Sequence, residues 1–78
     1  MNKARRKQLE DLIDQLGTIK DDIEAVMDEE QEAFDNMPEG IQNSERGEAM
    51  KENIDNLQSA IDSLESEVID YVQQVIDA

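Results

Sequence analysis

The stretch "DNMPEGIQNSERGEAM", residues 35–50, lies near the centre of the 78-residue chain and holds its single proline and two of its three glycines. Pro38 cannot continue a helix that arrives from its N-terminal side, and Gly40 is free to adopt a positive φ. Asn43 and Ser44 are favourable N-cap residues for a helix that begins after them. The stretch therefore predicts a turn between two helices.

Apolar residues on both sides of the turn recur at alternating spacings of three and four, which is the a/d pattern of a coiled coil. In the first half the seam positions are Leu9, Leu12, Leu16, Ile19, Ile23, Val26, Glu30, Ala33 and Met37. In the second half they are Met50, Ile54, Leu57, Ile61, Leu64, Val68, Tyr71 and Val75. The two series share a centre near residue 40, so Leu9 meets Tyr71 and Leu16 meets Leu64 when the chain folds back.

This shared centre predicts an all-α fold, an antiparallel two-helix coiled-coil hairpin. Gly47 is expected to face Ala33, where the two backbones approach closely beside the turn. The expected organisation is a single domain over 1–78, with helix 1 near 3–36, the turn near 37–43 and helix 2 near 44–77.

Two further apolar stripes run beside the predicted seam and widen the apolar face beyond what a lone hairpin needs. The stripe residues are Ile13, Met27 and Phe34 on helix 1, and Ile69, Val72 and Ile76 on helix 2. An apolar face of this width is usually buried against another helix. We expect a homodimer that forms a four-helix bundle, and the alternatives are a docking face for a different protein and a monomer with a partly apolar surface.

The chain is strongly acidic, with 21 aspartate and glutamate residues against seven lysine and arginine residues and a net charge of −14. Four basic residues lie within the first seven positions, so the remainder carries 21 acidic against three basic residues, a net charge of −18. Such a body repels nucleic acid and anionic membranes and attracts basic protein surfaces. The basic start of the chain is expected to meet acidic groups at the end of helix 2. The residues concerned are Lys3, Arg5, Arg6 and Lys7, opposite Asp70, Asp77, the terminal carboxylate and the negative end of the helix dipole.

Acidic residues recur every seven positions along the outer face of helix 1, at Asp14, Asp21, Asp28 and Asp35. The rise of an α-helix places them in a row about 10.5 Å apart, and Glu24 and Glu32 flank this row. Acidic helix faces usually serve solubility. This one lacks the interleaved lysines and arginines that would give stabilising i,i+4 pairs, so a binding role for basic proteins is the sharper hypothesis.

The residues that carry most enzyme chemistry are missing from the sequence. It has neither cysteine nor histidine, which excludes thiolate and imidazole nucleophiles, bases and metal ligands. No glycine-rich phosphate loop or EF-hand loop occurs. We therefore expect no enzyme activity, no cofactor and no metal site.

Residues 34–66, "FDNMPEGIQNSERGEAMKENIDNLQSAIDSLES", resemble a group of small phage and prophage proteins that carry a -DNLPESLQ-S-RGE- segment followed by a helix of the -AIDNL-AIDSLE- kind. The matches include Asp35, Asn36, Pro38, Glu39, Gln42, Ser44, Arg46, Gly47, Glu48, Ile54, Asp55, Asn56, Leu57, Ala60, Ile61, Asp62, Ser63, Leu64 and Glu65. Met37, Gly40 and Ile41 depart from the pattern. The resemblance implies a helical hairpin of mobile-element origin and brings no catalytic residues.

These observations together favour a non-enzymatic, phage-type binding protein in the cytoplasm of a bacterial host. Its acidic face would imitate the nucleic-acid backbone and inhibit a basic host protein that handles nucleic acid or acts in defence. The alternative is a structural or assembly adaptor that docks through the apolar stripe. Neither reading involves direct contact with nucleic acid or membrane.

Overall fold

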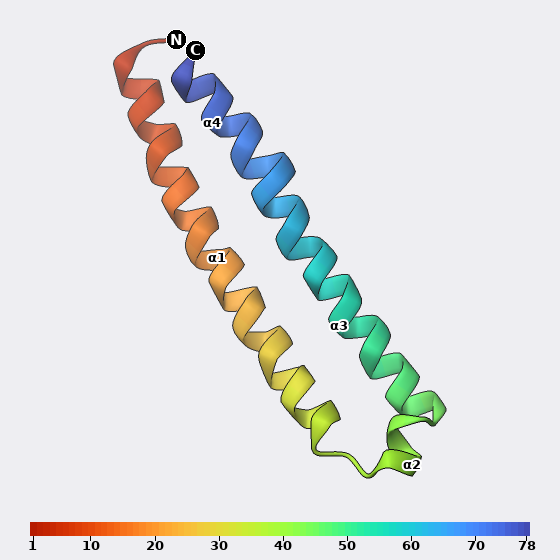
Figure 1. Cartoon of the computed structure of the whole chain (residues 1–78). Helices are drawn as coiled ribbons and strands as arrows, with labels where there is room; N and C mark the ends of the chain where they lie inside the picture. The colour runs from red at the N-terminus through yellow and green to blue at the C-terminus, as the bar shows by residue number, and fades with distance from the viewer.

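The computed structural model describes residues 1–78 as two long helical arms that run antiparallel and bring the two ends of the chain side by side (Figure 1). The first arm is α1, Lys3–Asp35. The second arm consists of α3, Glu45–Ser63, the π-helix η1, Leu64–Ile69, and α4, Asp70–Asp77. The hairpin measures 58 × 16 × 12 Å. The all-α fold and the helical hairpin predicted from the sequence are thus present.

The turn is more ordered than the sequence predicts, because it contains a short helix, α2, at Glu39–Gln42. Pro38 adopts φ −56° and ψ 144° and forms the N-cap of α2. Its carbonyl oxygen accepts hydrogen bonds from the amides of Ile41 and Gln42, at 2.9 and 3.0 Å. Gly40 lies inside this helical turn, and no residue of the chain has a positive φ. Gly40 therefore does not use the positive φ that a glycine can adopt, since one turn of helix reverses the chain without it.

The start of α3 follows the capping chemistry expected from its residue types. Ser44 is the N-cap, and its hydroxyl oxygen accepts a hydrogen bond of 3.5 Å from the Gly47 amide. Glu45 and Glu48 lie in the first turn of α3, where the positive end of the helix dipole favours them. Asn43 instead forms the C-cap of α2.

Gly47 permits a close backbone approach, although to a different neighbour from the one expected. A side chain at Gly47 would collide with the backbone of Gln42, whereas Ala33 is exposed. The Gln42 amide group donates a 3.0 Å hydrogen bond to the carbonyl oxygen of Phe34. The contact of Gly47 with Gln42 therefore fixes α3 against the turn, and Gln42 fixes the turn against the end of α1.

The seam between the arms follows five of the nine positions predicted in the first half of the chain. Leu9, Leu16, Ile23, Glu30 and Met37 are half-buried as expected. The other four seam positions are exposed, and the residues that follow them are half-buried instead. The exposed positions are Leu12, Ile19, Val26 and Ala33, and the half-buried ones are Ile13, Lys20, Met27 and Phe34.

The second arm follows the predicted seam through Leu64 and then departs from it by one residue. Val68, Tyr71 and Val75 are exposed, and the residues that follow them, Ile69, Val72 and Ile76, are half-buried. The change occurs within η1, where the wider π-helical turn accommodates one extra residue. The π-helix therefore rotates the rest of the arm and moves a different apolar stripe into the seam.

Candidate interaction surfaces

Handedness decides which side of the hairpin each residue lies on. In two antiparallel right-handed helices, residues that precede a seam residue by one position lie on the same broad side of the pair. Residues that follow a seam residue by one position lie on the opposite broad side. The two broad sides of this hairpin can therefore be assigned from the half-buried positions alone.

One broad side carries most of the large apolar residues that the hairpin leaves exposed. These residues each precede a half-buried seam residue, and they are 42–66% exposed. We call them the exposed apolar face: Leu12, Ile19, Val26, Val68, Tyr71 and Val75.

A groove of about 300 Å³ runs along the exposed apolar face between the arms. It is lined by Leu9, Leu12, Gln15, Leu16, Ile19 and Val72. Five of these six residues are apolar, so the groove is suited to an apolar side chain rather than a charged one.

The structure places the stripe expected to contact a partner inside the hairpin. Its six residues are half-buried between the arms: Ile13, Met27, Phe34, Ile69, Val72 and Ile76. The Lys51 ammonium group also lies 5.4 Å from the centre of the Phe34 ring. The location of the outward apolar surface must therefore be corrected to the exposed apolar face, because the seam uses the neighbouring stripe on α1 and on α4.

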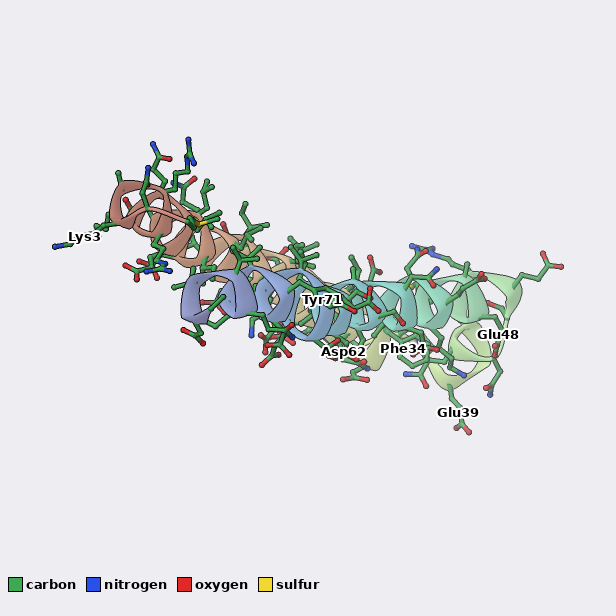
Figure 2. The ribbon with its side chains drawn as sticks, turned by 90° about the horizontal axis from the view of Figure 1, so that it is seen from above. Lys3, Phe34, Glu39, Glu48, Asp62 and Tyr71 are labelled. Carbon is green, nitrogen blue, oxygen red and sulfur yellow. The ribbon has the colours of Figure 1, made fainter.

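The opposite broad side carries two rows of acidic residues, each of which directly follows a seam residue. We call these the acidic face: Asp14, Asp21, Asp28 and Asp35 of α1, and Glu48, Asp55, Asp62, Asp70 and Asp77 of the second arm. All nine residues are exposed. Figure 2 shows the labelled Asp62 side chain on the lower side of the ribbon. The row predicted on α1 is therefore joined by a second acidic row on the neighbouring arm.

The two flanking acids predicted for the row differ in position. Both Glu24 and Glu32 are exposed. Glu24 follows the seam residue Ile23 and lies beside the acidic face, whereas Glu32 lies farther round, on the outer edge of α1. The spacing along one helix places both glutamates near the row. It does not show which of them faces the acidic side, because that depends on which residues form the seam.

Few groups within the chain neutralise the acidic face. Lys51 pairs with Glu48 at 3.3 Å, and Asp14, Asp21, Asp28 and Asp55 have no side-chain ion pair or hydrogen bond. Glutamine amides donate to three other aspartates at 3.0 Å, in pairs four residues apart. The pairs are Gln31 with Asp35, Gln58 with Asp62, and Gln73 with Asp77. The glutamines hold these carboxylates in place without removing their charge.

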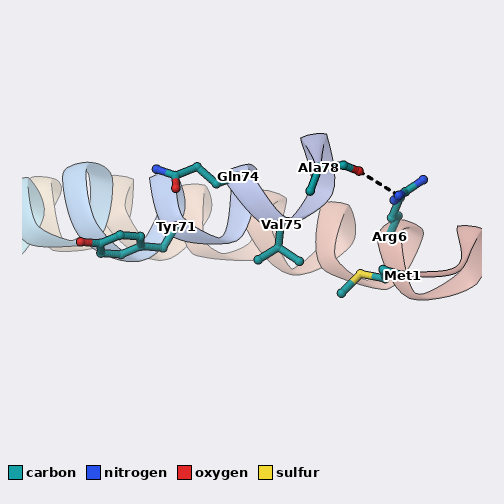
Figure 3. Close-up of a pocket in the computed structure, with 6 residues that line it drawn as sticks. All are labelled: Met1, Arg6, Tyr71, Gln74, Val75 and Ala78. Atoms are coloured by element: carbon teal, nitrogen blue, oxygen red, sulfur yellow. Dashed lines mark hydrogen bonds between the residues drawn. The ribbon is translucent and has the colours of Figure 1, made fainter.

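The basic start of the chain reaches the end of α4 through one residue. A terminal nitrogen of Arg6 donates a 2.9 Å hydrogen bond to the main-chain oxygen of Ala78 (Figure 3). Lys7 instead forms an ion pair of 3.1 Å with Asp11 on its own helix. No ion pair joins the basic segment to Asp70 or Asp77. The expected contact between the chain ends therefore exists at the main-chain end of α4, whereas Asp70 and Asp77 take no part in it.

A second hollow, of about 530 Å³, lies beside this contact. It is lined by Met1, Arg6, Tyr71, Gln74, Val75 and Ala78. In Figure 3 the side chains of Met1, Tyr71 and Val75 lie on the same side of the ribbon. The exposed apolar surface therefore extends along α4 to the chain ends.

Other kinds of site have little support in the structure. No three acidic side chains are grouped closely enough to hold a metal ion. None of the helices combines the length and the hydropathy of a membrane span. Comparison with protein-family models, with curated proteins and with solved structures finds no match to this chain. The interaction surfaces therefore carry the functional argument alone.

Proposed function

We propose that this chain is a non-enzymatic binding protein whose acidic face occupies the basic nucleic-acid site of another protein and inhibits it. One observation carries the proposal: two acidic rows from different arms lie on one broad side of the hairpin. Parallel rows of carboxylates at regular intervals resemble the charge pattern of two phosphate strands. A basic groove shaped for nucleic acid would be attracted to such a surface over a long range.

The shortage of compensating charge supports this reading over a role in solubility alone. A surface that only had to be soluble would gain stability from interleaved lysines. Instead, the exposed carboxylates of Asp14, Asp21 and Asp28 remain without partners in the chain. Regular helices also keep these charges in a fixed array, which reduces the entropy lost on binding.

The resemblance of residues 34–66 to small phage proteins gives this proposal a biological setting. An inhibitor encoded by a mobile element would act in the cytoplasm of its bacterial host, on an enzyme of nucleic-acid metabolism or defence. The working form in this proposal is a homodimer, the four-helix bundle expected from the width of the apolar surface.

A second candidate is an assembly adaptor, and the exposed apolar face favours it. Six large apolar residues on one side are a substantial patch for a chain of this size. An adaptor of this kind would bind an apolar partner surface. Its complexes would resist salt, whereas complexes made through the acidic face would dissociate.

The experiment that tests the proposal captures partners from bacterial lysate on the immobilised protein and elutes them with salt up to about 0.5 M or with duplex DNA. Two charge-reversal variants have the same net charge: Asp21→Lys with Asp28→Lys on the acidic face, and Glu32→Lys with Glu52→Lys on the outer edges of the two arms, where both glutamates are exposed. We expect capture of a basic nucleic-acid-binding protein that DNA displaces, and loss of capture only in the first variant. Equal capture by both variants would contradict the proposal.

A further inference from the structure

We infer that the exposed apolar face is the site where a second copy of this chain docks, so that two hairpins form a four-helix bundle with their acidic faces outward. This assignment replaces the stripe of Ile13, Met27 and Phe34 as the contact surface. It concerns the chain itself and stands whether or not the acidic face inhibits a basic protein.

The isolated hairpin has almost no core of its own. Of its 78 residues only Gly47 and Ile61 are buried, and Ile61 is the sole buried apolar side chain, at 5% exposure. A chain of this length usually needs a disulfide, a metal or self-association to be stable. It contains no cysteine and no cluster of metal ligands. Self-association would supply the buried apolar surface that the isolated hairpin lacks.

Charge selects a second copy as the occupant of this face. A protein with a net charge of −14 repels its own copies. The geometry reduces that repulsion, because both acidic rows lie on the side opposite the exposed apolar face. Two hairpins that meet through their apolar faces therefore keep their acidic faces apart. A basic partner would instead be drawn to the acidic side and away from this one.

The dimensions of the hairpin suit a dimer interface. A stable interface of standard size buries about 800 Å² on each partner, and the broad side of the hairpin extends over 58 × 16 Å. The groove of about 300 Å³ between the arms provides a recess for an apolar side chain of the second copy. Tyr71, at 66% exposure, is the most exposed large apolar residue of the chain and projects from the same broad side.

The π-helix η1 contributes directly to this surface. In an uninterrupted α-helix, Val68, Tyr71 and Val75 would continue the seam of α3 and face α1. The wider turn rotates them outward, where Tyr71 and Val75 line the hollow beside Met1 and Arg6, and it moves their neighbours into the seam. Irregular π-turns often occur where a function depends on the rearranged side chains. Here the rearrangement extends the apolar surface over both arms.

A dimer of this form has two acidic faces, one on each outer side. If the proposed inhibition is correct, which this further consequence assumes, each dimer has room for two basic partner molecules. The symmetry is isologous, since the same surface of each copy forms the contact.

The test measures the mass of the full-length protein by analytical ultracentrifugation over a range of concentrations. The natural sequence is expected to sediment as twice the 8.9 kDa chain. Ile19→Lys lowers the net negative charge of the chain. It should nevertheless raise the dissociation constant of the dimer at least tenfold, because it places an ammonium group on the exposed apolar face. Asp21→Lys makes a larger change of charge on the other side and should leave the dimer intact. A monomeric natural sequence, or equal masses for the two variants, would overturn the inference.

A second measurement covers the case in which Ile19→Lys loses its helical structure. Because the chain has no cysteine, single cysteines can report proximity. Val26→Cys on the exposed apolar face and Asp28→Cys on the acidic face are labelled with spin probes in the otherwise natural protein. Dipolar coupling between copies is expected at position 26 and should be weaker at position 28. The reverse order, or no coupling at either position, would overturn the inference, and neither result depends on any partner protein.

Discussion

The Nζ atom of Lys20 lies 3.5 Å from a carboxylate oxygen of Glu65, and this is the only ion pair that joins the two long arms. The Lys20 side chain is only 23% exposed, since it occupies a seam position between apolar neighbours, while that of Glu65 is 65% exposed. A lysine held in this way keeps its charge close to apolar surface. Partly exposed ion pairs contribute little to stability.

We expect Lys20→Met to raise the free energy of unfolding by about 1 kcal/mol, because an apolar side chain of similar length fits the seam better. For a chain of this size that corresponds to a rise in Tm of about 4–8 °C. Thermal unfolding followed by circular dichroism measures it. The matched change Glu65→Gln should alter stability by less than about 1 kcal/mol. A fall in Tm for Lys20→Met would show that the ion pair matters more than the packing.

Gly17 and Gly47 should respond in opposite ways to the same substitution. A Cβ atom at Gly17 meets nothing within 4 Å, so Gly17→Ala gains helix propensity and should stabilise the chain by about 1 kcal/mol. A Cβ atom at Gly47 collides with the backbone of Gln42, so Gly47→Ala should destabilise it by about 1–3 kcal/mol. Chemical denaturation of both variants measures the two effects. Similar changes for the two variants would mean that the close approach at Gly47 is relaxed in solution.

The π-helix can be tested by removing one residue. Deleting Glu67 from η1 would allow a continuous α-helix that still directs Ile69, Val72 and Ile76 into the seam. We expect this variant to remain helical and to be at least as stable as the natural sequence, because π-turns are less favourable than α-turns. Deleting Asp21 from α1 is the matched control, and it should lower Tm by more than about 10 °C, since it rotates half of α1 out of register. Equal losses in the two variants would contradict the role assigned to η1.

The sequence predicts the hairpin well because the apolar residues that create the sequence pattern are also the residues that hold the two arms together. Two series with a common centre can pack only as an antiparallel pair, and Pro38 and Ser44 mark the ends of the turn by their backbone chemistry. The arms and the turn of the structure follow from these residues. The additional helical turn at Glu39–Gln42 depends on local hydrogen bonds to Pro38, which spacing does not reveal.

The choice of seam is less predictable, because α1 carries three adjacent apolar stripes, which begin at Leu9, Leu12 and Ile13, and only two of them can face the other arm. On α1 the structure half-buries Met27 and Phe34 and leaves Val26 and Ala33 exposed, so the larger side chains fill the interface. On the second arm a single π-turn changes the choice after Leu64. A pattern with a period of seven fits either stripe equally well. For this reason the acidic row on α1 was predictable, whereas the outward apolar surface required the structure.

The ion pair between Lys7 and Asp11 gives a prediction about pH. The hydrogen bond from Lys7 to the Asp11 carboxylate, and the charge of that carboxylate, raise the pKa of Lys7 above its usual 10.5. Stability from this pair is therefore fully present below pH 10.5 and is lost as the pH rises through the higher pKa of the folded state. NMR titration of the Lys7 side chain should show the raised pKa. Asp11→Asn should abolish most of the shift and Asp14→Asn little of it, because Asp14 contributes least. Equal effects of the two variants would contradict this assignment.

The final prediction concerns what the acidic face costs the fold. Asp14, Asp21 and Asp28 are exposed and have no partner in the chain, so their carboxylates repel one another and the rest of a chain that carries −14. Replacing all three by asparagine, whose helix propensity is similar, should raise Tm in dilute buffer. At about 1 M salt the Debye length falls to about 3 Å, and most of the difference should disappear.

Thermal unfolding of the triple variant and of the natural sequence at both salt concentrations decides the matter. If the variant is more stable only in dilute buffer, the acidic row is retained at the expense of stability, which supports selection for binding. If the triple variant and the natural sequence have the same Tm at both salt concentrations, the carboxylates do not destabilise the fold. Their arrangement would then need no explanation beyond solubility, and the inhibitor proposal would lose its main physical support.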